Sequence, residues 1–252
     1  MNDDGIALRK NAKDSLDIGN YLPSRSLSTP SIPGYLEETY WWAYLRPRAI
    51  WMFEREWLVN LILWGNMARL TQAVINEMDC GHGDAVLQVA CVYGDFSNLL
   101  ATHLQLNSSR LSLVDIAPIQ LNNARSKLSH HSNVDLHHQD SSALHFADGC
   151  FARTVVFFLL HEQPEDVRRK TITEAIRVTR PGGKLVFVDY HGPKRSNPLR
   201  YMMKPVLHWL EPFALDLWRT ELPDYLPKDI PPERIRSQFY CGGLYQKIVI
   251  TC

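Results

Sequence analysis

Short apolar runs alternate with stretches of helical periodicity from residue 84 to the end of the chain. Apolar runs of this length, bounded by turn residues, are typical of buried strands. Strand–helix alternation predicts an α/β fold with a doubly wound, mostly parallel sheet. The predicted strands are VLQVA (86–90), LSLVD (111–115), VDLHH (134–138), VVFFLL (155–160) and KLVFVDY (184–190).

Helices are predicted between these strands, one of them opened by Pro164 at a helix start. RPGG (180–183) marks the return to the sheet. A helical insert follows at about 192–222, and QFYCGGLYQKIVI (238–250) predicts two more strands around a Cys-Gly-Gly turn. The pattern therefore predicts a seven-stranded domain over residues 81–252.

The chain before this domain has two parts. Residues 1–33 are polar and contain Ser and Pro, which favours a flexible leader. Residues 34–80 predict helices that Pro47 divides. Apolar residues then recur at spacings of three and four, which predicts one buried face of a helix. Its members are Leu63, Met67, Leu70, Val74 and Met78.

Aromatic residues are concentrated in the segment 35–64, which holds five of the seven tryptophans. One interpretation is that these helices pack on the domain core. The other is that an aromatic surface faces a membrane, with Arg46, Arg48 and Arg55 near lipid headgroups. Both interpretations remain open at this point.

Composition excludes several classes of protein. The 27 Lys and Arg residues equal the 27 Asp and Glu residues, so the basic excess of a nucleic-acid-binding protein is missing. Five cysteines without a CxxC pair favour a reducing compartment over a disulfide framework. The N-terminus resembles no secretory signal, and no apolar run approaches the ~20 residues that cross a bilayer. The chain is therefore expected to be soluble or peripheral.

Three predicted strand ends carry candidate cofactor residues. The loop in LQVACVYGDFS (87–97) has the layout of a nucleotide-binding strand–loop–helix, Asp115 ends the second strand, and Asp140 with Ser141 follows the third. Ligands of doubly wound sheets bind at the carboxyl ends of strands. A carboxylate at Asp115 can accept both ribose hydroxyls of an adenosine, and Asp140 can contact the adenine.

Together with RPGG, this ordered trio resembles class I S-adenosylmethionine-dependent methyltransferases over residues 84–250, and most closely the ubiquinone and menaquinone C-methyltransferases. VACVYGDFS, VVFFLLHEQP and GGLYQKIVI further resemble the RquA family of rhodoquinone biosynthesis proteins. That resemblance implies conversion of ubiquinone to rhodoquinone, in which an amino group replaces a ring methoxy group. It also implies S-adenosylmethionine as amino donor, a requirement for Mn²⁺, and a peripheral position on the cytoplasmic face of a bacterial membrane.

The first loop departs from the methyltransferase pattern. Gln88 replaces the acid that helps to hold the methionine ammonium, and a neutral amide favours the charged amine much less. Val92 and Tyr93 add bulk where glycine lets a cofactor approach. A drifted loop in an ordinary methyltransferase, or in an inactive one, is the alternative. The predicted cofactor-binding residues are Gln88, Ala90, Val92, Tyr93, Gly94, Asp95, Asp115, Ile116, Asp140 and Ser141.

The reaction centre is predicted where the fourth and fifth strands end. His161, Glu162 and Asp189 are candidate ligands of Mn²⁺, which prefers oxygen and imidazole donors. Tyr93, His161 and His191 are the candidate catalytic residues. The alternative for His161 and Glu162 is a structural role as a cap of the helix at Pro164.

Three functions are compatible with these features. The first is quinone amination, with the insert and residues 35–64 forming an apolar channel for the polyprenyl tail of ubiquinone. The second is an ordinary quinone C-methyltransferase, and the third is a non-catalytic quinone- or adenosyl-binding protein.

Overall fold

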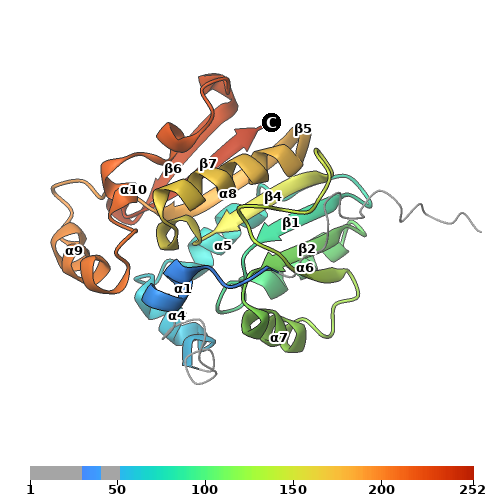
Figure 1. Ribbon diagram of the computed structural model, residues 1–252, viewed down its shortest axis with the longest axis horizontal. Helices are drawn as coiled ribbons and strands as arrows, with labels where there is room; N and C mark the ends of the chain where they lie inside the picture. The colour runs from blue at the N-terminus through green and yellow to red at the C-terminus, as the bar shows by residue number, and fades with distance from the viewer. Residues whose placement is uncertain (1–29, 41–51) are drawn as a thin grey trace, which may run out of the picture.

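A seven-stranded sheet forms the centre of the protein in the computed structural model, which describes residues 30–40 and 52–252 (Figure 1). The strand order is β3-β2-β1-β4-β5-β7-β6, in which β1 to β5 are parallel and β7 is antiparallel to both of its neighbours. This confirms the predicted doubly wound α/β fold. The strands are β1 (Ala85–Val89), β2 (Arg110–Asp115), β3 (Val134–His138), β4 (Phe151–Phe157), β5 (Thr179–Tyr190), β6 (Ile235–Tyr240) and β7 (Tyr245–Thr251).

Helices cover both faces of the sheet. Buried residues of α5 and α6 pack with Val86 and Val155 on one face, and α7 packs beside them on Leu113. On the other face α8 packs on Leu87 and Val156, and it lies in front of the sheet in Figure 1. The α-helices are α1 (Gly34–Thr39), α4 (Glu56–Ile62), α5 (Met67–Ile75), α6 (Phe96–Gln105), α7 (Pro118–Lys127), α8 (Glu165–Val178), α9 (Leu199–Leu210) and α10 (Asp216–Arg219). The short 3₁₀ helices are η2 (Leu160–Glu162), η3 (Leu222–Tyr225), η4 (Pro232–Arg234) and η5 (Cys241–Gly243).

Most sequence-based elements are confirmed within a few residues. The five residues of the predicted helix face are all buried, and α5 carries its centre. Pro164 is the N-cap of α8. The prediction for RPGG is wrong in detail, because 180–183 lie inside β5 rather than before it. The register shifts there between Phe151 and Arg153, and Gly182 has a φ of 76°, so the segment bulges out of the strand.

An ion-pair cluster joins the end of the α5 segment to the sheet. Glu77 Oε1 lies 3.0 Å from Lys247 Nζ, and its Oε2 lies 3.1 Å from Lys184 Nζ and 2.8 Å from an Arg236 nitrogen. Burial opposes ionisation, but the bonds from Lys247 and Lys184 outweigh it and lower the pKa of Glu77 to about 2. This cluster therefore fastens α5 to β5, β6 and β7.

Some predictions concern residues that the structure does not describe. The leader up to residue 29, the division at Pro47 and the roles of Arg46 and Arg48 lie outside the described residues. The proposed boundaries near residues 33 and 80 stay predictions. Within 30–40 and 52–252, no helix is both long and apolar enough to cross a membrane.

Candidate active site

A cavity of about 580 Å³ opens at the carboxyl ends of the parallel strands. Its walls come from the loop after β1, the ends of β2 and β4, and the loop after β3. Residues of α1, α4 and α9, which gather on one side of the molecule in Figure 1, close it on the outside. Most of its lining is apolar. The carboxyl groups in its lining are those of Asp115, Asp140, Glu162 and Glu211.

Gln88 supports the β1 loop from the protein interior. The side chain is fully buried, and its Nε2 donates to the Ala90 carbonyl at 3.0 Å and to Ser97 Oγ of α6 at 2.9 Å. Ala90 adopts a φ of 71°, a region that few residues other than glycine occupy, and lines the cavity. Gln88 itself is not among the described lining residues. Its amide therefore fixes the shape of the loop without reaching the cavity.

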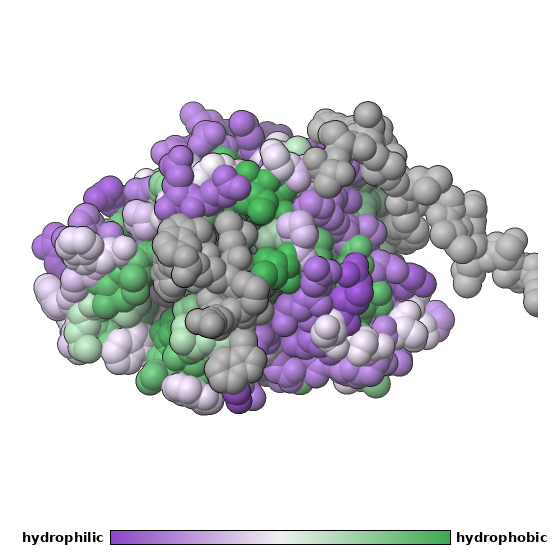
Figure 2. All heavy atoms as spheres, turned by 60° about the horizontal axis from the view of Figure 1, so that its bottom comes forward, coloured by the Kyte–Doolittle hydropathy of each residue, from purple (hydrophilic) through white to green (hydrophobic). Residues whose placement is uncertain are grey.

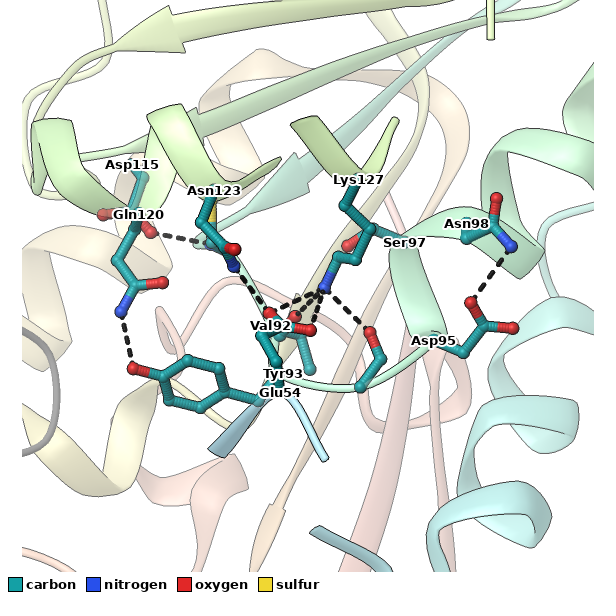
Figure 3. A network of polar contacts seen from close by, with 12 residues as sticks. Glu54, Val92, Tyr93, Asp95, Ser97, Asn98, Asp115, Gln120, Asn123 and Lys127 are labelled. Carbon is teal, nitrogen blue, oxygen red and sulfur yellow. Dashed lines mark hydrogen bonds and ion pairs between the residues drawn. The ribbon is translucent and has the colours of Figure 1, made fainter. Parts of the chain in front are cut away.

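A lysine of α7 holds the same loop from outside (Figure 3). Lys127 Nζ donates to the carbonyls of Val92 at 3.2 Å and Gly94 at 2.8 Å, and it pairs with both oxygens of Glu54 at 2.9 and 3.0 Å. Asn123 also donates to Glu54, at 2.7 Å. Because Glu54 precedes α4, one cation connects the loop, α7 and the N-terminal segment.

Tyr93 lies between the N-terminal segment and α7. Its hydroxyl accepts a hydrogen bond from Gln120 Nε2 at 2.7 Å, and its ring stacks on Phe53 with centroids 5.5 Å apart. Tyr93 and Val92 both line the cavity, as their predicted role requires. Asp95 is placed differently, because it is the N-cap residue of α6 and does not line the cavity. The loop is therefore crowded by side chains that are fixed by packing.

Asp115 is held at the end of β2 by backbone donors. Its Oδ2 accepts from the Cys91 N–H at 2.7 Å and its Oδ1 from the Ala117 N–H at 2.8 Å. Burial raises the pKa of Asp115, and these two donors partly oppose that rise. Ile116 lines the cavity beside it. The two backbone donors therefore fix the orientation of this carboxyl group, which lines the cavity.

Asp140 and Ser141 form the wall beyond β3, as predicted. Asp140 Oδ1 accepts from the Ser142 N–H and hydroxyl, both at 2.8 Å. Ser141 Oγ accepts from Gln163 Nε2 at 3.0 Å and lies 3.0 Å from Thr171 Oγ1. The structure therefore brings the loops after β1, β2 and β3 together around one cavity.

His161 is the centre of a buried acid–imidazole cluster. Its Nδ1 lies 2.9 Å from Asp189 Oδ1, and its Nε2 lies 3.7 Å from Glu162 Oε1 and 3.9 Å from Glu211 Oε2. Burial alone lowers the pKa of His161, but the charges of Asp189, Glu211 and Glu162 raise it to about 9. The imidazole is therefore protonated at neutral pH and lines the cavity.

Asp189 does not fit the predicted role of metal ligand. Its Oδ2 accepts from the Leu160 and His161 N–H groups at 2.8 and 3.3 Å, and its Oδ1 accepts from the Tyr190 N–H at 2.7 Å and pairs with His161. These partners occupy both oxygens. Among the described residues, no group of three or more His, Cys, Asp or Glu side chains is arranged to hold a metal ion. The predicted metal-ligand set of His161, Glu162 and Asp189 is therefore corrected, because Asp189 positions the imidazole of His161 instead of facing a metal ion.

His191 is also placed away from the cavity. Its Nδ1 lies 2.7 Å from the Gly243 carbonyl, and its ring packs on Phe239 with centroids 4.6 Å apart. His191 follows the last residue of β5 and is not among the described residues that line the cavity. The structure does not support the predicted catalytic role of His191.

Glu211, at the C-cap of α9, is a cavity residue that the sequence analysis missed. Arg168 fixes its segment to that of His161. The fully buried guanidinium donates to the Leu160 carbonyl at 2.8 Å, the Gln163 carbonyl at 2.9 Å and the Phe213 carbonyl at 3.0 Å. The sequence carried one signal for Glu211. A glutamate at the C-terminus of a helix interacts unfavourably with the helix dipole, so its presence there indicates a role other than helix stability.

Comparisons with known proteins agree with this geometry. Residues 86–183 match the family model described as a methyltransferase domain. The matched segment runs from β1 into β5 and contains the β1 loop, Asp115, Asp140 and His161. Part of the chain that lines the cavity, including α4 and α9, lies outside the match.

Relatives at low identity carry names of quinone methyltransferases. Demethylmenaquinone methyltransferase of Lactiplantibacillus plantarum is 27% identical over 153 residues, which are 60% of this chain and 61% of the relative. 2-Phytyl-1,4-naphtoquinone methyltransferase of Thermosynechococcus vestitus is 24% identical over 192 residues, 69% of this chain and 83% of the relative. The match spans 58–61% of the length of three demethylmenaquinone methyltransferases.

Solved structures show the same fold. The mitomycin 7-O-methyltransferase MmcR superposes with a TM-score of 0.62 at 14% identity, covering 85% of this chain and 61% of that one. The N-methyltransferase NodS from Bradyrhizobium japonicum gives 0.51 at 18% identity, covering 73% of this chain and 93% of that one. The protein therefore has the Rossmann-like class I methyltransferase fold.

Proposed function

We propose that the protein binds S-adenosylmethionine in this cavity and uses it to modify a polyprenyl quinone. The observation that carries the proposal is the placement of Asp115 and Asp140 at neighbouring strand ends, on the wall of one largely apolar cavity. A second NodS structure contains S-adenosylhomocysteine on the same fold, with a TM-score of 0.50 at 16% identity. The names of the relatives support a quinone as the second substrate.

The finer proposal is amination of ubiquinone to rhodoquinone, as the resemblance to the RquA family implies. A methoxy-bearing quinone carbon is a vinylogous ester. The amine of S-adenosylmethionine adds there, its proton is removed, and the methoxy group leaves as methanol. Completing the conversion requires cleavage of the bond between this nitrogen and the methionine α-carbon; in a redox-neutral elimination the β-carbon loses a proton, the bonding electrons leave with the nitrogen, which takes up a proton, and the carbon chain becomes an α,β-unsaturated carboxylate. The crowded loop at Val92 and Tyr93 supports the proposal, because it displaces the methionine arm from its usual path.

His161 supplies the acid in this proposal. It is protonated at neutral pH and lines the cavity, so its Nε2–H can donate to the quinone carbonyl and stabilise the charge that develops on addition. Asp189 holds the ring through Nδ1. Tyr93 borders the path between the β1 loop and this imidazole. His161, held by Asp189, can therefore orient the quinone and donate a proton to it.

Manganese has no assigned site here, since the three residues predicted to bind it do not form a ligand set. No step of the proposed reaction passes through a metal. The requirement that the family resemblance implies stays a prediction with a direct test. Chelator-treated protein is assayed with and without added Mn²⁺, and equal rates would refute a requirement.

The competing function is transfer of methyl to a quinone carbon, which the names of the relatives favour. Purified protein, S-adenosylmethionine and a short-tail ubiquinone separate the possibilities by mass spectrometry. Exchange of methoxy for amino lowers the quinone mass and releases methanol. A parallel reaction contains a demethyl-quinone, which has a ring carbon that can exchange hydrogen for methyl, and a mass increase of that quinone would identify a C-methyltransferase. An unchanged quinone in both reactions would favour a non-catalytic binding protein.

We further propose peripheral membrane binding through α4 and α9. Trp57 is 67% exposed on α4, Trp209 is 81% exposed on α9, and the two segments touch where Trp64 Nε1 donates to Met203 Sδ at 3.2 Å. Hydrophobic patches lie on this face in Figure 2. Leu61, Ile62, Val206 and Leu210 are both exposed and part of the cavity lining. The surface therefore surrounds the cavity entrance, where a lipid tail enters.

Liposome flotation tests this surface. The double variant Trp57→Ser, Trp209→Ser is expected to lose most of its binding to anionic vesicles, because interfacial aromatic residues anchor proteins at the headgroup level. Leu106→Ser on the far end of α6 removes an equally exposed side chain (80%) outside the surface and serves as control. Equal flotation of both variants would refute the proposed orientation.

A further inference from the structure

The described lining of the cavity is acidic and contains no lysine or arginine. Asp115, Asp140, Glu162 and Glu211 contribute carboxyl groups, and His161 is the basic side chain among them. Removing a carboxylate from water without a counter-charge is costly. A ligand with a positive charge would lower that cost. The cavity therefore favours a cationic group.

The carboxyl groups differ in how fully they are used. Asp115 accepts two backbone N–H groups, and Asp140 caps the turn at Ser142. Glu211 is different, because it accepts a hydrogen bond from the Tyr40 hydroxyl while its Oε2 atom is buried and makes no hydrogen bond within the described part of the chain. This oxygen lies 3.9 Å from His161 Nε2, beyond hydrogen-bond distance. A buried hydrogen-bond acceptor that has no donor in the protein indicates that a bound ligand supplies the donor.

We propose that Glu211, together with Glu162, binds the α-ammonium group of the adenosyl ligand's amino acid chain. The inference rests on the proposed use of S-adenosylmethionine. The β1 position at which an acid would serve this purpose holds Gln88, which does not reach the cavity. The counter-charge comes instead from Glu162 of η2 and from Glu211 at the end of α9, which line the same cavity.

This placement has a consequence for reactivity. It holds the nitrogen beside His161, the group proposed to polarise the quinone, rather than against the β1 loop. Burial raises the pKa of Glu211, while His161 and the neighbouring Tyr40 hydroxyl oppose the rise. Glu211 therefore places the amine next to the imidazole that polarises the quinone.

Calorimetry with two ligands tests the site without any quinone. S-adenosylhomocysteine carries the ammonium, and its des-amino analogue has hydrogen in its place. Glu211→Gln is expected to weaken S-adenosylhomocysteine binding by about tenfold or more, the usual effect of losing a charged hydrogen bond. Binding of the des-amino analogue should stay within about twofold, since it makes no use of the carboxylate. Glu221→Gln, an exposed glutamate of the same insert, is the matched control.

Each outcome decides for or against the site. A differential loss that Glu211→Asp partly restores supports it, and thermal melting of each variant shows that the fold is intact. Equal weakening of both ligands would mean that Glu211 shapes the cavity, and no weakening would mean that the ammonium lies elsewhere; both overturn the proposal. The differential loss combined with methyl transfer to quinones would keep the site and refute amination. Wild-type protein that bound neither ligand would overturn both.

Discussion

Glu77 and Glu211 are both shielded from solvent, but their electrostatic surroundings are opposite. Glu77 contacts three cations, and its pKa falls to about 2. Glu211 faces one imidazole shared with two other carboxylates, and burial raises its pKa. The first arrangement satisfies every charge and fastens α5 to the sheet. The second leaves a buried oxygen without a partner at the wall of a cavity.

The difference separates structural charge from functional charge. Full pairing of a buried carboxylate stabilises the native state and leaves nothing for a ligand. Incomplete pairing is unfavourable in the free protein, and such perturbed groups are concentrated at functional sites. The substitutions that follow should therefore change stability at Glu77 and function at the cavity.

The largest effect is expected for His161→Gln. Removal of a positioned acid lowers rates by about 10²–10⁴-fold, so kcat should fall by roughly a thousandfold. Because the imidazole acts in its protonated form, the wild-type rate should decline above about pH 9, where the proton is lost. Initial rates across pH measure both effects. A variant that kept its rate would remove His161 from the reaction.

Glu77→Gln should reduce stability by about 2 kcal/mol, because Lys247 stays buried without its partner and the other two cations are partly exposed. The folded pKa of Glu77 lies below its ordinary value of 4.5. Its stabilising contribution is therefore present above about pH 4.5 and is lost as pH falls toward 2. Urea unfolding across pH should show a flatter dependence in this interval for the variant. Activity at neutral pH should stay unchanged. A large loss of activity would contradict a purely structural role of Glu77.

Asp115→Asn tests a cavity carboxylate that is bound by two backbone donors. The amide keeps the shape but cannot accept all of the hydrogen bonds, so adenosyl-ligand affinity should fall by about tenfold. Unfolding free energy should change less, because an uncharged group is easier to bury. Calorimetry with S-adenosylhomocysteine measures the loss, and unchanged affinity would place the ribose elsewhere.

Tyr93→Phe should have the smallest effect. It removes the hydrogen bond from Gln120 but keeps the ring on Phe53, so the cost is about 1 kcal/mol. A modest rise in KM with little change in kcat is expected if the ring only shapes the cavity. A drop in kcat alone would assign the hydroxyl a direct part in the reaction.

Strand order and strand ends were accessible from the sequence, whereas side-chain direction was not. Alternating apolar runs located five parallel strands, and parallel strands place their carboxyl ends together, so Asp115 and Asp140 were correctly expected to lie near each other. Gln88 on β1 and Asp189 on β5 do not line the cavity, because their side chains bond to Ser97 and to the Leu160 N–H. Both faces of these strand segments are buried, so the apolar pattern has no alternation from which side-chain direction could be predicted.

Glu211 was missed for a different reason. It belongs to the insert, where the pattern predicts helices but not how they pack. Its place in the cavity depends on Arg168, whose bonds to Leu160 and Phe213 join two segments about 50 residues apart. Long-range polar contacts of this kind leave little local signal in a sequence.

In the proposed reaction an amine, not a methyl group, is transferred to the quinone. S-adenosylmethionine labelled with ¹⁵N in the amino group and ¹³C in the methyl group tests it in one reaction that contains short-tail ubiquinone and a demethyl-quinone, whose free ring carbon can accept a methyl group. Mass spectrometry of the extracted quinones should find ¹⁵N in the ring substituent and no ¹³C. Transfer of ¹³C without ¹⁵N would contradict the claim and identify the protein as a quinone methyltransferase.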